Sequence, residues 1–82
     1  MAEYKVQIEE SFRADSKHHI VTSLNVYLGP SYHGCVWKFD EEERTAIVVV
    51  PEERFVGDHT EEKFLEGLLK KEFVKFVERI SD

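Results

Sequence analysis

The residues best suited to chemistry in this 82-residue chain form an acidic run, Asp40-Glu41-Glu42-Glu43, between two strand-like stretches. Calcium takes several carboxylate oxygens at about 2.3–2.6 Å, and four carboxylates on one turn can supply them. The run lacks the alternating Asp/Asn positions and the central glycine of an EF-hand loop. We therefore predict only weak calcium binding by these four residues, on the order of 10⁻⁴–10⁻³ M. The alternative is a solvated turn that keeps a hairpin soluble, because charge runs are usually solvated.

His33 and Cys35 stand two residues apart on one face of a predicted strand, and the other histidines lie elsewhere in the chain. Structural zinc takes four ligands, commonly from paired short spacings, which one cysteine and scattered histidines do not provide. A nucleophilic cysteine needs a lowered thiol pKa and an orienting group, and the sequence shows neither. We expect Cys35 to be a small core residue beside Trp37 that reacts slowly with thiol reagents. We predict no catalytic residue and no cofactor site.

Four lysines, Lys63, Lys70, Lys71 and Lys75, make a positive stripe on the exposed side of a predicted C-terminal helix. The order of four strands followed by a helix resembles the PC4-like fold, and this resemblance implies single-stranded nucleic-acid binding. Such binding also needs aromatic side chains interleaved with the basic ones, and the exposed side of this helix has none. Because the formal net charge of the chain is -6, nucleic acid is repelled over long range. We expect nucleic acid not to be a partner.

Most of the chain before the helix is predicted to form strands. Apolar Tyr4, Val6 and Ile8 alternate with polar residues, which is typical of a strand with one buried side. Gly29 and Pro30 are interpreted as the end of the second strand, because proline cannot donate a ladder hydrogen bond. The predicted strands are residues 3–12, 18–28, 34–39 and 45–50, with residues 54–56 as a candidate fifth strand.

One long amphipathic helix is predicted over residues 59–80, with Asp58 as its N-cap. Gly67 falls outside its apolar arc and is interpreted as a tolerated defect. The arc comprises Leu65, Leu68, Leu69, Phe73, Phe76, Val77 and Ile80. Residues 1–82 are thus predicted to be a single α+β domain. Its antiparallel sheet has four to five strands in a meander, flat or curled, packed by this C-terminal helix.

The stretch from Ala46 to Val50 is continuously apolar and mostly β-branched, a pattern typical of a strand covered on both faces. One helix covers one face of a sheet, so the other face needs curling or a partner. We therefore predict a small non-enzymatic binding or assembly module. Its partner is another protein or a second copy of the chain, and we expect self-association at high concentration.

Composition indicates the compartment. The single cysteine excludes an internal disulfide, no apolar run reaches the length of a membrane span, and no signal-peptide pattern opens the sequence. These features predict a cytoplasmic protein without a membrane partner. With 41% hydrophobic and 34% charged residues, we expect an ordered, acidic and soluble domain. One asparagine and one glutamine among many glutamates and lysines is a composition typical of thermophilic proteins.

Overall fold

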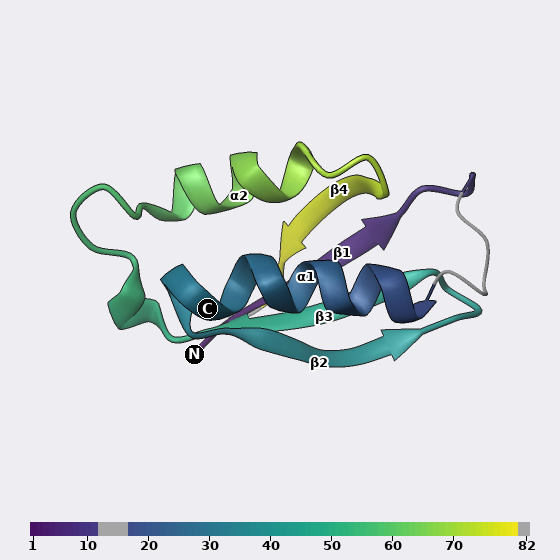
Figure 1. The fold of residues 1–82 in the computed structure, drawn as a ribbon, viewed down its shortest axis with the longest axis horizontal. Helices are drawn as coiled ribbons and strands as arrows, with labels where there is room; N and C mark the ends of the chain where they lie inside the picture. The colour runs from purple at the N-terminus through teal and green to yellow at the C-terminus, as the bar shows by residue number, and fades with distance from the viewer. Residues whose placement is uncertain (12–16, 81–82) are drawn as a thin grey trace.

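The computed structural model describes residues 1–11 and 17–80, in which strands and helices follow the order βαββαβ (Figure 1). A short 3₁₀ helix, η2 at Glu52–Arg54, lies between the third strand and the second helix. The other elements are β1 at Ala2–Ile8, α1 at Lys17–Tyr32, β2 at Cys35–Asp40, β3 at Thr45–Val50, α2 at Glu61–Leu69 and β4 at Val74–Arg79.

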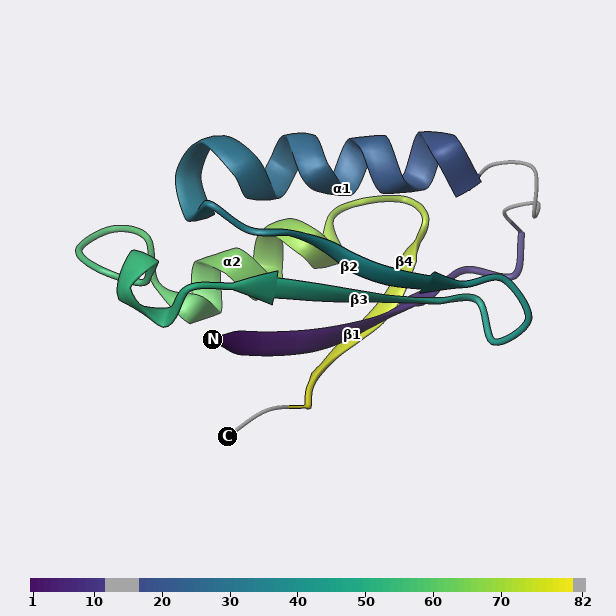
Figure 2. The same cartoon turned by 90° about the horizontal axis from the view of Figure 1, so that it is seen from below.

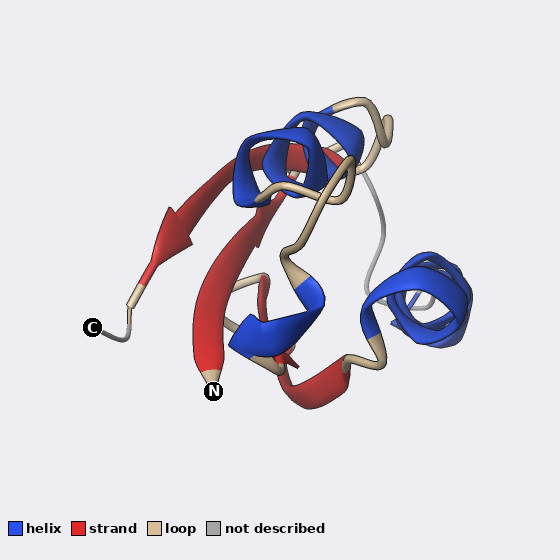
Figure 3. Ribbon diagram, turned by 90° about the vertical axis from the view of Figure 1, so that its left-hand side faces the viewer, coloured by secondary structure: helices blue, strands red, loops and turns tan. Residues whose placement is uncertain are grey.

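The four strands form one sheet in the order β2-β3-β1-β4, and every neighbouring pair is antiparallel. β1 and β2 therefore run parallel to each other with β3 between them, and α1 makes the crossover that joins them. This is the split βαβ, or ferredoxin-like, topology. Both helices lie on the same side of the sheet, as Figure 2 and the end-on view in Figure 3 show. The predicted antiparallel sheet of an α+β domain is confirmed, with four strands. The predicted meander is wrong, because the consecutive strands β1 and β2 are not neighbours in the sheet and helices join β1 to β2 and β3 to β4.

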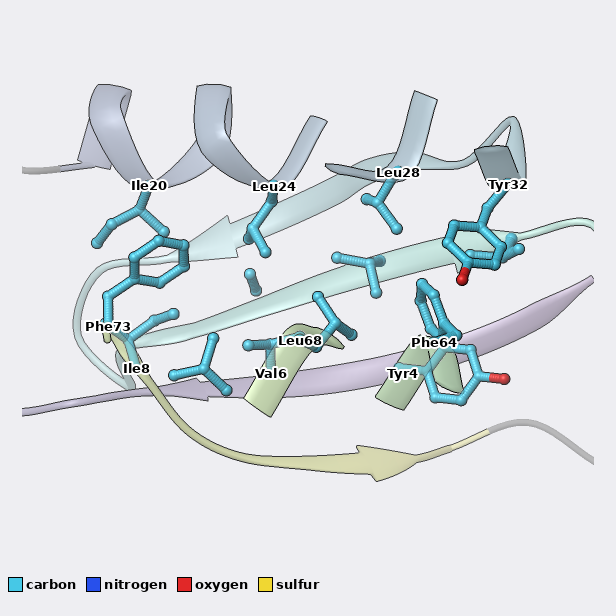
Figure 4. Packing of buried hydrophobic residues seen from close by; sticks show 14 of the residues in the cluster. Tyr4, Val6, Ile8, Ile20, Leu24, Leu28, Tyr32, Phe64, Leu68 and Phe73 are labelled. Carbon is cyan, nitrogen blue, oxygen red and sulfur yellow. The ribbon is translucent and has the colours of Figure 1, made fainter. Parts of the chain in front are cut away.

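The core lies between the two helices and one face of the sheet (Figure 4). The predicted alternation is confirmed over β1, where every second side chain is buried and the others are partly exposed. The last residue of the predicted first strand, Phe12, lies outside the described residues. The buried cluster comprises Ala2, Tyr4, Val6, Ile8, Ile20, Leu24, Leu28, Tyr32, Ala46, Val48, Val50, Phe64, Leu68, Phe73 and Val74.

The prediction of a second strand at residues 18–28 is wrong, because these residues belong to α1. Ile20, Leu24 and Leu28 are spaced by four residues, and that spacing fits both the period of a strand and the period of a helix. Val26 distinguishes the two structures. A strand would bury Val26 with these three residues, whereas α1 leaves it 66% exposed.

The prediction of a single long C-terminal helix is also wrong, because residues 59–80 contain α2, a turn and β4 instead. The N-cap of α2 is Thr60 and not Asp58, since the Thr60 hydroxyl accepts a hydrogen bond from the Lys63 amide at 3.2 Å. β4 pairs with β1 along the edge that β3 leaves free. This pairing of distant segments overrides the helical pattern of the sequence. The candidate fifth strand at 54–56 is not formed, because its first residue ends η2.

Gly67 permits a close approach between the helices, so its interpretation as a tolerated defect is wrong. A Cβ atom on Gly67 would lie 2.0 Å from the hydroxyl oxygen of Tyr27 and 2.7 Å from its Cζ atom. The same hydroxyl donates a hydrogen bond to the carbonyl oxygen of Phe64 at 3.0 Å. The Tyr27 ring is therefore held between α1 and α2, where an added methyl group has no room.

We expect Gly67→Ala to lower the free energy of unfolding by up to about 2 kcal/mol. Overpacking usually costs about 1–3 kcal/mol, and the helix propensity of alanine offsets about 1 kcal/mol of that cost. Urea unfolding of Gly67→Ala, Tyr27→Phe and the double variant measures the effect. Removing the Tyr27 hydroxyl should reduce the cost of the alanine. Additive effects, or a stabilised Gly67→Ala variant, would contradict the close approach.

Candidate functional site, the open face of the sheet

The face of the sheet that points away from the helices is here called the open face. Directly paired residues of neighbouring strands point to the same face. On β1 the side chains of Glu3, Lys5 and Gln7 point away from the core, so their partners across the sheet do so as well. From β2 to β4, the paired residues form three rows: Cys35, Val49, Glu3 and Ile80; Lys38, Ile47, Lys5 and Glu78; and Asp40, Thr45, Gln7 and Phe76.

Trp37 joins the open face at its β2 edge. The register between β2 and β3 shifts between Val36 and Lys38, so Trp37 has no partner residue on β3. Val36 pairs with core residue Val48 and faces the helices, and the next residue of a strand faces the other way. The Trp37 side chain is 72% exposed. The bulge therefore presents the one tryptophan of the chain to solvent beside the second row.

Large apolar side chains lie at both edges of the open face. Trp37 stands at the β2 edge, while Phe76 and Ile80, 43% and 47% exposed, stand at the β4 edge. On β3, Ile47 is partly exposed on this face, whereas Val49 is 8% exposed and therefore already buried. These exposed apolar residues on one face make the open face the candidate interaction surface, although they stand at its two edges and not in one contiguous patch.

Each outer strand carries features that oppose pairing with another strand. On β2 the Val36 amide already donates to Oδ1 of Asn25 on α1 at 2.9 Å, and the bulge at Trp37 interrupts the ladder. β4 carries Lys75 and Arg79 and has its own register shift against β1. Bulges and charged residues protect sheet edges from strand addition. The open face, and not an edge, is thus the surface best suited to a partner.

A polar network holds β4 in place from the helix side. The Tyr4 hydroxyl and Nη1 of Arg79 each donate to Oε2 of Glu61 at 2.5 Å, and Nη2 of Arg79 donates to Oε1 of Glu52 at 2.5 Å. Burial of the phenol, followed by its bond to Glu61, raises the pKa of Tyr4 above its ordinary value. The network joins β1, β4, η2 and α2, and it thereby positions the strand that presents Phe76.

The acidic run forms the turn between β2 and β3. Oδ1 of Asp40 accepts hydrogen bonds from the amides of Glu42 and Glu43 at 3.0 and 3.1 Å, and Oε1 of Glu41 lies 3.5 Å from Nζ of Lys17. Within residues 1–11 and 17–80, no three or more His, Cys, Asp or Glu side chains gather in a way that could hold a metal ion. Weak calcium binding by Asp40, Glu41, Glu42 and Glu43 stays a prediction.

The predicted lysine stripe is not one helix face. Lys63 lies in α2, Lys70 is the C-cap of α2, and Lys75 lies in β4. Lys71 follows the C-cap, and its Nζ atom lies 5.5 Å from the centroid of the Tyr27 ring.

The element order that resembles the PC4-like fold is also absent, because a helix separates β1 from β2. Four-stranded RNA-binding sheets stack bases on aromatic side chains. The central strands β1 and β3 carry no aromatic residue on the open face, and the absence of a nucleic-acid partner stays a prediction.

Cys35 is exposed on β2, so its expected place in the core is wrong. His33 precedes the strand in a left-handed conformation, with φ 52°, and its Nε2 atom lies 3.2 Å from Nη2 of Arg54.

We now expect the native Cys35 thiol to react with a thiol reagent within about tenfold of the rate in the unfolded chain, because exposure governs access. Stopped-flow labelling with and without denaturant measures both rates. A much slower native rate would show that the thiol is covered.

No protein-family model matches this chain, and neither does a curated protein or a solved structure. In the described part of the chain, no helix has the length and apolar character that crossing a bilayer requires. Fold and surface together define an α+β domain of split βαβ topology whose sheet is covered by helices on one face.

Proposed function

We propose that this chain is a small non-enzymatic binding or assembly module that acts through the open face of its sheet. The observation that carries the proposal is Trp37, 72% exposed, on the same face as the half-exposed Phe76 and Ile80. Burying a large apolar side chain stabilises by about 1.5–3 kcal/mol relative to leaving it in water. A partner surface over the open face recovers that free energy for several side chains at once.

The charges of the open face favour a protein partner. Lys5 and Lys38 lie among Glu3, Asp40 and Glu78, so neither sign dominates. Nucleic acid needs a mainly positive surface. Protein interfaces combine aromatic residues with polar groups that find partners across the contact, and tryptophan is among the residues that contribute most to such contacts.

We also infer a cytoplasmic location. Cys35 is the one cysteine of the chain, and its side chain is exposed. An exposed single thiol is open to disulfide formation in oxidising compartments and is kept reduced in the cytoplasm. Cell fractionation with an antibody against the chain tests the location.

The test of the open face uses a photoactivatable phenylalanine analogue in place of Ile47. A matched variant carries the analogue in place of Val26, which is 66% exposed on α1, away from the sheet. Each purified variant is irradiated alone and in a cell extract of the source organism. We expect adducts from position 47 only, suppressed by an excess of unlabelled chain and not by an excess of Trp37→Glu. Equal labelling from both positions, or equal competition by Trp37→Glu, would contradict the proposal.

A further inference from the structure

We propose that the partner of the open face is a second copy of this chain, packed face to face about a two-fold axis parallel to the strands. The inference rests on the proposed function, because it names the occupant of the same surface. Two sheets packed in this way lie about 10 Å apart, with their strands nearly aligned.

The first argument is the position of the exposed apolar residues. A two-fold axis parallel to the strands reverses the strand order, so β2 of one copy lies over β4 of the other. Trp37 of one copy then meets Phe76 and Ile80 of the partner copy, and symmetry makes this contact twice. The apolar residues at opposite edges of one sheet are too far apart to cover each other. The dimer brings them together.

The second argument is the charge pattern of the middle row. With the axis parallel to the strands, Lys38 of one copy opposes Glu78 of the partner copy, again twice, and Lys5 opposes the apolar Ile47. A two-fold axis perpendicular to the strands in the same plane would place each strand over itself. Lys38 would then face Lys38, and Lys5 would face Lys5. Opposed like charges are costly in an interface, so the charges select the first arrangement.

The third argument is the size of the face. Four strands about 4.8 Å apart and six residues long, with a rise of about 3.3 Å per residue, cover about 19 by 20 Å. This footprint of about 380 Å² is roughly half of the about 800 Å² per partner that a standard specific interface buries, so the contact belongs to the weak, transient class. We therefore expect a weak dimer with a dissociation constant on the order of 10⁻⁵–10⁻³ M.

The test measures the dimer dissociation constant by sedimentation equilibrium for the wild-type chain, Lys38→Glu, Glu78→Lys and the double variant. We expect each single change to weaken the dimer about tenfold or more, and the double change to restore it to within about threefold of wild type. Circular dichroism checks that each variant keeps the fold. A wild-type chain that stays monomeric at millimolar concentration, or a double variant without rescue, would overturn the inference.

Cross-linking tests the same geometry without changing a charge. The Ile80→Cys variant keeps Cys35, and the two thiols of opposed copies lie in the same row. A bis-maleimide with a spacer of about 10 Å should therefore join these chains far more efficiently than wild-type chains, in which the two Cys35 thiols lie at opposite edges. Efficient cross-linking of the wild-type chain would instead indicate pairing of two β2 edges and would overturn the face-to-face arrangement.

The two proposals fail separately. If the purified chain is monomeric while the photoactivatable residue at position 47 joins it to a different protein, and Trp37→Glu does not compete, the second copy is excluded and the binding module stands. If position 47 gives no specific adduct with any chain, both proposals fall.

Discussion

Phe64→Ala should lower the free energy of unfolding by about 3–5 kcal/mol. Phe64 is fully buried in α2, and its ring centroid lies 5.2 Å from that of Tyr4, 6.0 Å from Tyr27, 4.8 Å from Tyr32 and 5.5 Å from Phe55. These rings come from β1, α1, α2 and the segment after η2, so none of them can move into the vacated space alone. The substitution leaves a cavity where these parts of the chain meet, and urea unfolding measures its cost.

Leu69 and Val74 provide the matched controls. The apolar arc of the sequence places Leu69 in the core and leaves Val74 exposed, and the structure reverses both positions: Leu69 is 50% exposed and Val74 is buried. Leu69→Ala should therefore cost less than about 1 kcal/mol, and Val74→Ala should cost about 2 kcal/mol for its two lost methyl groups. Phe73 is buried as predicted. A larger loss for Leu69→Ala than for Val74→Ala would show that the boundary between α2 and β4 is misplaced.

Trp37→Glu should weaken self-association by about 30-fold or more, because the dimer buries Trp37 twice and burying one large apolar side chain contributes about 1.5–3 kcal/mol. The free energy of unfolding should change by less than about 0.5 kcal/mol, since the side chain is 72% exposed and outside the core. Val26→Glu, at a comparably exposed site on α1, should leave association unchanged. Sedimentation and urea unfolding of both variants separate a lost interface from a lost fold. An equal loss of association in both variants would indicate a non-specific effect of charge.

Three strands are predictable from the sequence because local pattern and tertiary role agree in them. β1 alternates strictly, and β3 is β-branched throughout its second half, so both sequences favour the extended chain that the sheet requires. α1 and β4 are not predictable in the same way. The spacing of Ile20, Leu24 and Leu28 is compatible with both periods, and β4 has a helical pattern that is overridden by its pairing with β1.

Part of the open face is predictable and part is not. The continuous apolar stretch over β3 indicates apolar side chains on both faces of the strand, and Ile47 and Val49 do lie on the open face. Strict alternation puts Cys35, Trp37 and Phe39 on a single face. The bulge after Val36 breaks that alternation, because one extra residue sends the side chains beyond it to the opposite face. Phe39 therefore packs against the core while Trp37 and Cys35 face solvent, and no signal in the sequence marks the bulge.

Amide chemical shifts followed on dilution of the isotope-labelled chain from millimolar to micromolar concentration test most directly whether the open face is the binding surface. The expected result is a saturable set of shifts at Lys5, Ile47, Val49 and Glu78 on three strands of the open face, with the amide of Val26 on α1 unchanged. Shifts concentrated on α1 or α2, or confined to β2, would contradict an interface on the open face.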